Sequence, residues 1–289
     1  MTKSNSDSAD HAPSVAAQHA AAQDVRRRVD WPFYLGMCCL AGSYVGLITL
    51  LIAGDIYFSK LNHFGAILRD PNIQYSIKLS VISCCLTTIL AMWVSVPVAY
   101  LMSRFEFRGK TFLDSLLDIP IVLPPLVIGL SLLILFRQTP LRVLDDYFGI
   151  AFHIPAVVLA QFSVAAAFAV RTLRATFDDL SPRQEQVALT LGCSRSQAFW
   201  KVVLPEARHG LLTAATLAWA RSLGEFGPIL VFAGSTRQKT EVLPVSVHLE
   251  LSIGNVEGAV AVSLLMVAMA VLVLMSVRMI TRTHILRMS

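Results

Sequence analysis

Long uncharged stretches recur along the chain, and short polar segments separate them. A helix needs about 20 consecutive apolar residues to cross the hydrocarbon core of a membrane. Six stretches meet or approach this length, at residues 33–53, 79–103, 119–136, 153–170, 206–233 and 258–277. The third contains prolines, the fourth is short, and the fifth is interrupted by Arg221 and Glu225. The pattern predicts an all-α, polytopic membrane protein with six transmembrane helices.

The segment between the fourth and fifth stretches is polar and begins with a helix-start signal. Ser181 is followed by Pro182, the residue type favoured at the first helical position, and by Gln184 at the spacing of a capping box. The helix is expected to stop at Gly192, because glycine most easily takes the left-handed conformation that ends helices.

A second short helix is expected after this glycine. Ser194 and Gln197 repeat the capping-box spacing. An apolar stripe at i, i+3 and i+4 follows, made of Phe199, Val202 and Val203. Pro205 is expected to end this helix and to open the next transmembrane helix. Two capped helices with an apolar stripe, lying outside the lipid, indicate a docking site for another protein; a stable surface loop without a partner is the alternative.

Composition supports the membrane interpretation. Of the 289 residues, 55% are hydrophobic and 15% are charged, whereas charged residues make up roughly 25% of ordinary soluble domains. The mean hydropathy is +0.63. A soluble protein with an unusually apolar core would rarely need uncharged runs of this length.

The first 30 residues differ from the rest of the chain. Residues 1–30 hold no aromatic residue and are rich in Ala, Ser, Asp and Gln, which predicts a disordered cytoplasmic tail. A cleaved secretory signal would carry a shorter apolar core much nearer Met1, so the first span is expected to be retained. The other expected regions are a first transmembrane helix with its extracytoplasmic loop at residues 31–72, a transmembrane domain at residues 73–280, and a cytoplasmic tail at residues 281–289.

Lysine and arginine are divided unequally between the two sides of the predicted helices. Six spans put both termini on one side, which receives 16 of the 24 basic residues, while the other side receives 7 and Arg221 lies within a span. Positive loops stay in the cytoplasm. Both termini and the polar segment at residues 181–205 are therefore predicted to be cytoplasmic, in a multi-pass protein of the cytoplasmic (inner) membrane. These arginines account for the net charge of +5 without a nucleic-acid partner.

Motifs for catalysis and for metal binding are missing from the sequence. The 5 cysteines and 7 histidines show no zinc-ligand spacing. There is no phosphate-binding loop, nucleophile elbow or paired-carboxylate site. The sequence predicts no catalytic residue, no metal and no cofactor.

Arg221 and Glu225 are four residues apart in a predicted transmembrane helix, on one face and close enough to pair. Charges inside a membrane are costly and usually face a bundle interior or a cavity. Two interpretations stay open: an ion pair that braces helices, or a direct role at a gate or on the path of an anion. Gly227 and Pro228 would loosen the helix beside the pair, as happens in discontinuous helices at transport sites.

Prolines interrupt the third predicted span as well. Pro124 and Pro125, with Pro120 before them, would break the helix. The break is either a kink that serves packing or a bend that lines a pathway. Asp114 and Asp118 lie near the cytoplasmic entrance of this span.

The polar segment resembles a known cytoplasmic loop. Gly192, nine residues, Val202, one residue and then Leu204-Pro205 is similar to the "EAA…G…I-LP" loop of binding-protein-dependent ABC importer permeases. In that family the loop forms coupling helices that dock into a cleft on the ATPase subunit. The resemblance implies that these four residues take part in ATPase coupling.

The first half of this loop departs from the family pattern. Gln186 stands six residues before Gly192, where the family usually has Glu, and Glu185 lies one residue early. Val187 and Ala188 fill the two alanine places. The resemblance implies that Gln186, Val187 and Ala188 also contact the ATPase, and it leaves open whether a carboxylate does so.

Further stretches resemble the molybdate, tungstate and sulfate branch of the same family. They are "DIPIVLPPLVIGL" at residues 118–130, "ARSLGEFGPILVFAG" at residues 220–234, and the following "TEVLPVSVHLELSIGNVEGAVAVSLLM". The resemblance covers roughly residues 72–278.

The resemblance implies a permease subunit for a tetrahedral oxyanion, with molybdate as the first candidate and tungstate or sulfate as the others. Such a subunit works by alternating access as a homodimer in the lipid bilayer, with two copies of a separate ATPase and an extracytoplasmic solute-binding protein. The residues that we expect at its pathway or gate are Pro124, Pro125, Arg221, Glu225, Gly227 and Pro228. The alternatives are a proton-coupled secondary anion transporter that uses Glu225 and a membrane-embedded enzyme.

Overall fold

The computed structural model describes residues 15–58, 65 and 68–286. Within these ranges every regular element is helical, as the sequence predicted. The chain divides into two units, residues 1–55 and 56–289, which are described separately.

The described part of the first unit is formed by the long helix α1, Val15–Phe58, whose last three residues belong to the second unit. Helix α1 includes residues 15–30, which the sequence assigned to a disordered tail, and its alanine-rich start has high intrinsic helix propensity. Residues 1–14 lie outside the described residues. The part at Trp31–Phe58 is long and apolar enough to cross a membrane.

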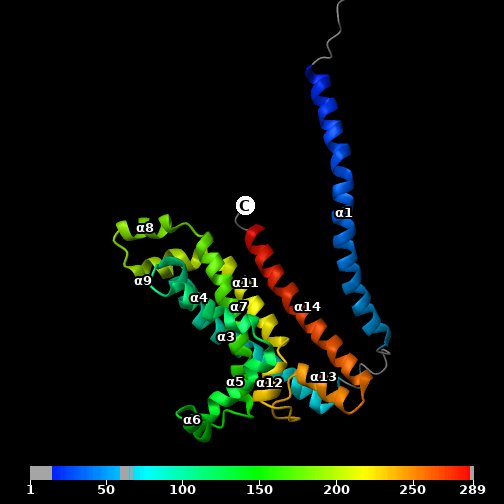
Figure 1. Ribbon diagram of the computed structural model, residues 1–289, viewed down its shortest axis with the longest axis vertical. Helices are drawn as coiled ribbons and strands as arrows, with labels where there is room; N and C mark the ends of the chain where they lie inside the picture. Colours follow the sequence, from blue (N-terminus) through cyan, green and yellow to red (C-terminus); the bar gives the residue numbers. More distant parts are fainter. Residues whose placement is uncertain (1–14, 59–64, 66–67, 287–289) are drawn as a thin grey trace, which may run out of the picture. The chain divides into compact units, whose positions relative to one another are not determined.

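The second unit is a bundle of helices with short connections (Figure 1). Its longer helices are α3 (Pro71–Arg104), α4 (Lys110–Val122), α5 (Pro125–Arg137), α7 (Ile154–Asp179), α11 (Arg208–Leu223) and α14 (Val256–Leu286). Its shorter helices are α6 (Leu141–Phe148), α8 (Pro182–Thr190), α9 (Arg195–Ala198), the π-helix η1 (Phe199–Val203), α10 (Leu204–Glu206), α12 (Gly227–Phe232) and α13 (Leu243–Ser252). Helix α14 continues into the predicted C-terminal tail.

Helices α3, α7 and α11 pack closely on one another at the centre of this bundle. Their contact uses small side chains, since Ala91, Ala165, Ala169 and Ala218 form one buried cluster. Alanines let helix backbones approach, as is usual at helix interfaces in membranes.

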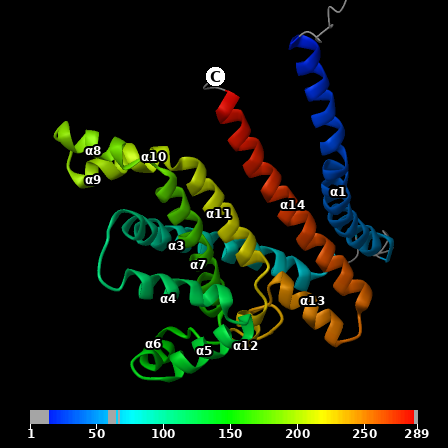
Figure 2. The same ribbon diagram turned by 45° about the horizontal axis from the view of Figure 1, so that its top comes forward.

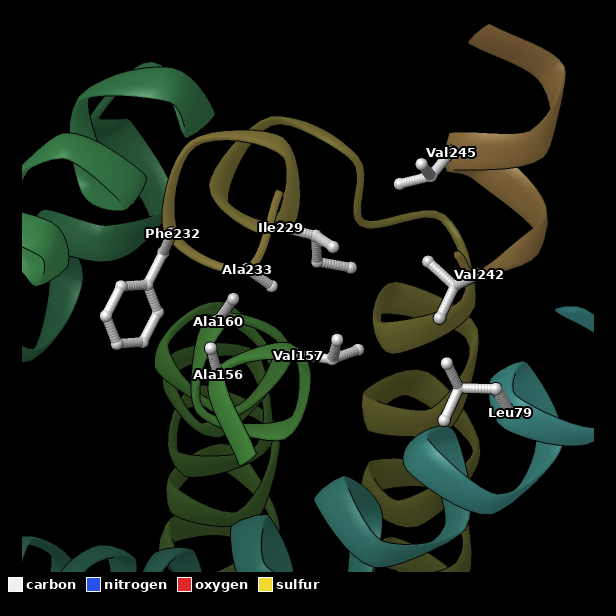
Figure 3. Close-up of a cluster of buried hydrophobic side chains, with 9 residues drawn as sticks. All are labelled: Leu79, Ala156, Val157, Ala160, Ile229, Phe232, Ala233, Val242 and Val245. Carbon is white, nitrogen blue, oxygen red and sulfur yellow. The ribbon is translucent and has the colours of Figure 1, made fainter. Parts of the chain in front are cut away.

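A second part of the core lies where α12 crosses the first turns of α7. Figure 3 shows Ile229 of α12, and Ala233 directly after it, beside side chains of the first turns of α7, with side chains of α3 and α13 to one side. Helices α5, α6 and α12 lie near this end of α7, while α8, α9 and α10 lie at its other end (Figure 2).

The helices differ from the six predicted spans. Four described helices are long and apolar enough to cross a membrane, at Trp31–Phe58, Pro71–Arg104, Ile154–Asp179 and Val256–Met279, or five if α4 and α5 together form one span. The six-span count is not confirmed. The expected fifth span, residues 206–233, is divided among α10, α11 and α12, and α11 has only 16 residues, about 24 Å of helix.

The third predicted span is two helices that meet at an angle of 111°. Helix α4 ends at Val122 and α5 begins at Pro125, because proline supplies no backbone donor and disfavours helix in the residue before it. Ion pairs hold α4 against α7: Arg174 binds Asp114, and Arg171 Nη1 lies 3.2 Å from Asp118 Oδ1.

Candidate functional site

The first candidate site is the α8–α10 segment, defined as residues 181–206. Ser181 caps α8, and its hydroxyl accepts from the amide of Arg183 at 3.4 Å. The predicted capping box would have used the amide of Gln184, so the cap is confirmed but its partner is one residue earlier. Proline at the first helical position is confirmed.

Gly192 ends this helix as predicted. Its φ is +91°, and the amide of Cys193 donates to the carbonyl of Ala188 at 3.1 Å. A hydrogen bond from the residue after a left-handed glycine back to a carbonyl in the last turn of the helix is a common motif that ends helices. Gly192 therefore reverses the chain between α8 and α9.

The second capping box is confirmed in full. The amide of Gln197 donates to Ser194 Oγ at 3.2 Å, and the amide of Ser194 donates to Gln197 Oε1 at 2.9 Å. The predicted end of this helix at Leu204-Pro205 is wrong, because α9, η1 and α10 follow one another without a break. The π turn explains the difference: Leu204 N bonds to Phe199 O, and this wider turn accommodates the proline that follows.

The apolar side chains of the α8–α10 segment divide into an inner and an outer set. In the predicted stripe, Val203 is buried and Phe199 and Val202 are half-buried, so the stripe faces the protein itself and not a partner. The outer set is Val187, Leu191 and Trp200, which are 56%, 80% and 63% exposed. Exposed apolar side chains are therefore present on this segment, but they belong to residues other than the predicted stripe.

The residues that the resemblance assigned to coupling are spread over this segment. Gln186, Gly192 and Pro205 are exposed, Val202 and Leu204 are half-buried, and Ala188 is buried. Ala188 therefore packs within the chain, while Gln186 and Val187 lie on the surface of α8.

A group at the end of α3 that sequence reasoning missed holds this segment in place. Tyr100 donates its hydroxyl proton to Glu185 Oε1 at 2.5 Å, and Arg104 Nε lies 3.5 Å from Glu185 Oε2. That contact is an ion pair and not a hydrogen bond, because Arg104 Nε has no hydrogen-bond partner. The sequence did contain a signal for this group. Tyr100 and Arg104 are four residues apart at the end of a predicted span, and the polar segment carries a carboxylate, Glu185, one residue before the place expected from the family pattern.

The second candidate site is the break between α11 and α12. Arg221 Nη2 lies 3.1 Å from Glu225 Oε2, so the predicted pairing is confirmed. Glu225 is 2% exposed, whereas the side chain of Arg221 is 34% exposed. The guanidinium of Arg221 also lies 4.9 Å from the ring centroid of Phe168 on α7, a contact that attracts a cation to the ring face.

Helices α5 and α12 meet beside this break. A Cβ at Gly129 would lie 2.7 Å from Pro228 Cα, and one at Gly227 would lie 2.9 Å from Pro125 Cβ. The structure therefore brings together three of the predicted pathway residues, Pro125, Gly227 and Pro228, while Pro124 is exposed at the start of α5. Within the described ranges, no hydrogen bond or ion pair joins Arg221 or Glu225 to α5.

Gln161 ties the end of α11 into the bundle, which the sequence did not reveal. This side chain is 1% exposed. It accepts from Thr87 Oγ1 at 3.0 Å and donates to the carbonyl of Ser222 at 3.1 Å. A buried amide is stable only when it is bonded in this way, so the bond helps to fix the point at which α11 breaks.

A polar cluster lies around Glu250 of α13. Arg237 Nη2 donates to Glu250 Oε1 at 2.9 Å, and this bond raises the pKa of Arg237. Asn255 donates to the other oxygen of Glu250 at 2.7 Å. In the part of the chain that the structure describes, no group of His, Cys, Asp and Glu could hold a metal ion.

Comparison with known proteins gives consistent matches. Residues 91–287 match the family described as "Binding-protein-dependent transport system inner membrane component". The chain is 38% identical over 252 residues to the molybdenum transport system permease protein ModB of Mycobacterium tuberculosis, covering 86% of this chain and 94% of that protein. It is 32% identical over 221 residues to the sulfate transport system permease protein CysT of Escherichia coli, covering 73% of this chain and 77% of that protein.

Two further matches concern a third oxyanion and the fold. The molybdate/tungstate transport system permease protein WtpB of Pyrococcus furiosus is 34% identical over 203 residues, covering 67% of this chain and 78% of that protein. A chain of a bacterial alginate ABC transporter, solved in complex with a pentasaccharide-bound periplasmic protein, superposes with a TM-score of 0.73 over 90% of this chain and 96% of its own. Its identity is 14%, so this match concerns the fold alone.

Proposed function

Because the chain belongs to the binding-protein-dependent transport system inner membrane component family, we propose that it is the permease subunit of an ATP-driven oxyanion importer. Molybdate is the first candidate substrate, with tungstate and sulfate as the others. The relatives named for molybdenum, molybdate/tungstate and sulfate transport carry this proposal. In this proposal a separate ATPase subunit, and not this chain, hydrolyses ATP.

The α8–α10 segment is the proposed docking site of a separate ATPase. Its outer set, Val187, Leu191 and Trp200, leaves large apolar side chains exposed on a segment whose inner side chains are packed. Exposed apolar patches mark interaction sites. Gln186, which is exposed on α8 next to Val187, supplies an uncharged polar contact to the ATPase in this proposal.

Glu185 is not the proposed carboxylate contact to the ATPase. Its two oxygens face Tyr100 and Arg104 within the same chain. We therefore assign polar contact with the ATPase to Gln186, and a positioning role to Glu185.

The assembly that we propose contains two copies of this chain, two ATPase subunits and one extracytoplasmic solute-binding protein. The alginate transporter with the same fold was solved with a periplasmic protein bound, which supports such a partner. Both termini and the α8–α10 segment lie in the cytoplasm in this proposal, because of the unequal distribution of lysine and arginine.

The two helix breaks are the proposed gate of the pathway. Pro124 is the N-cap of α5 and Pro125 begins it, while Gly227 and Pro228 begin α12, so both breaks present helix N-terminal ends. Helix N-terminal ends favour anions. Arg221 and Glu225 brace the second break as an ion pair, and only transport measurements separate this role from direct contact with the anion.

Reconstitution tests the proposed function. Proteoliposomes that contain the full complex, with binding protein outside and ATP inside, are expected to accumulate labelled molybdate only when ATP and binding protein are both present. Uptake that follows a proton gradient without ATP would instead establish the secondary transporter that uses Glu225. Titration of the binding protein with molybdate, tungstate and sulfate identifies the substrate, because selectivity is expected to lie in that partner.

A further inference from the structure

We infer that Tyr100 is the positioning residue that passes movement of the α8–α10 segment to the transmembrane helices. The inference rests on the proposed docking of an ATPase on this segment. It assigns a task to a side chain on α3, outside the loop that the family resemblance singled out.

Helix α8 has few attachments to the rest of the protein. It packs mainly on η1 and α9, which belong to the same segment. Among the described residues, Glu185 is the α8 side chain that reaches a transmembrane helix by a hydrogen bond or an ion pair, through Tyr100 and Arg104. Displacement of α8 by the docked ATPase is therefore transmitted to α3 through the carboxylate of Glu185.

The two sides of α8 are suited to this transfer. Glu185 and Val187 are two residues apart, about 200° around the helix, so they lie on opposite faces. Val187 is 56% exposed, whereas the side chain of Glu185 is 14% exposed. One face is free to meet a partner, and the other is bonded to the bundle.

The ring of Tyr100 joins the remaining elements. Its centroid lies 4.7 Å from that of Phe199 in η1, 5.8 Å from Phe177 in α7 and 6.4 Å from Phe105, all in edge-to-face contact. Phe177 is fully buried. Close-packed aromatic rings transmit displacement because they cannot be compressed. One side chain therefore contacts α7, α8 and η1 from its place on α3.

Arg104 adds a second link at the same place. Its Nη2 donates to the carbonyl of Leu180 at 3.0 Å, at the point where α7 ends. Together the two residues bind the end of α3 to both sides of the connection between α7 and α8.

The experiment uses the reconstituted full complex and measures uptake per ATP hydrolysed. Tyr100→Phe keeps the ring and removes the hydroxyl, and Glu185→Gln keeps an acceptor and removes the charge. Tyr147→Phe is the matched control, because Tyr147 is 84% exposed on α6. Affinity for the ATPase and melting temperature are measured on each variant.

The Tyr100→Phe variant is expected to bind the ATPase normally, and the complex is expected to hydrolyse ATP. Uptake per ATP hydrolysed is expected to fall about ten-fold, because one lost hydrogen bond to a charged group can have an effect of this size. Uptake per ATP in Glu185→Gln is expected to fall by less, because the amide oxygen can still accept from Tyr100. The double variant also loses the ion pair with Arg104, so it is expected to be at least as impaired as Tyr100→Phe alone. Glu185→Gln tests the link even where Tyr100→Phe folds poorly.

Unchanged uptake per ATP in both single variants would overturn the inference. Weakened ATPase binding in Tyr100→Phe would also overturn it, because Tyr100 would then only shape the docking surface. Failure of the proposed function is distinct from both results, since the unmodified complex would then show no ATP-dependent uptake.

Discussion

Two glycines at the two candidate sites are required for opposite reasons. Gly192, in the α8–α10 segment, has a φ of +91° and open space where a Cβ would stand. Gly129, in α5, is in a regular helix, but a Cβ there would lie 2.7 Å from the backbone of Pro228. The first position needs glycine for its backbone conformation, and the second needs it for space.

The difference extends to the regions around them. The α8–α10 segment is built by local rules, namely caps, a left-handed turn and a π turn, and it leaves Leu191 80% exposed. The break region is built by tertiary contacts, in which α5, α7, α11 and α12 meet. Substitutions should therefore damage function in the first region and folding in the second.

The largest effect is expected from Gly129→Val. The new side chain overlaps the backbone of Pro228, which cannot move as the end of a flexible side chain would, so destabilisation of about 3 kcal/mol is expected from overpacking. Gly36→Val is the control, because no atom lies within 4 Å of a Cβ there. Melting temperature in detergent and folded yield are the measurements. Equal melting temperatures for the two variants would contradict the close approach of α5 and α12.

The next effect is expected at Arg221 and Glu225. Arg221→Met and Glu225→Gln should each cost about 2 kcal/mol, less than a fully buried pair because Arg221 is partly exposed. The double variant should regain much of the loss, since neither partner is left alone. Melting temperature and oxyanion uptake are scored for all four members of the cycle.

The two readouts separate the two roles of this pair. Recovery of both stability and transport in the double variant would exclude direct contact with the anion. Recovery of stability without transport would exclude a purely structural pair. We expect the first result, because the pair is an i, i+4 contact and Arg221 is held further by Phe168.

A smaller effect on stability, but a large one on coupling, is expected from Gly192→Val. The left-handed backbone costs a residue with a Cβ about 1–2 kcal/mol, and there is no overlap to add to it. The variant should insert into the membrane and fold, but it should no longer stimulate the ATPase partner to hydrolyse ATP. Normal stimulation in this variant would show that the turn at Gly192 does not position a docking surface.

The same contrast explains what the sequence could predict. Ser194, Gln197 and Gly192 act on residues that are near in sequence, so their structure follows from spacing alone. The positions of Pro228 against Gly129, and of Gln161 under Ser222, depend on how helices far apart in the sequence pack. No spacing rule contains that information.

The differences between expectation and structure follow the same division. The stripe at Phe199, Val202 and Val203 was recognised as apolar, but whether it faces a partner or Tyr100 depends on where α3 lies. The six-span count assumed continuous helices, whereas Pro124 and Gly224 divide two of the expected spans into shorter pieces. Pairing of Arg221 with Glu225 was predicted from their i, i+4 spacing, and it forms although Glu225 lies beyond Leu223, the last residue of α11.

The smallest effect on stability is expected from single cysteines at Gln197 and Lys239 in a cysteine-free background, because both side chains are exposed and Gln197 contributes one bond to the cap of α9. A membrane-impermeant thiol reagent, applied to sealed right-side-out cells, should label position 239 and miss position 197. Labelling at position 197 would reverse the proposed orientation and would place the α8–α10 segment out of reach of a cytoplasmic ATPase.

Site-specific photo-crosslinking tests the docking of the ATPase most directly. A photoreactive residue at position 191 replaces the most exposed apolar side chain of the α8–α10 segment, and one at position 147 replaces an equally exposed tyrosine on α6, where Leu191 is 80% and Tyr147 is 84% exposed. We expect the complete complex to yield a crosslink to the ATPase from position 191 and none from position 147. A crosslink from position 147, or none from position 191, would contradict this expectation.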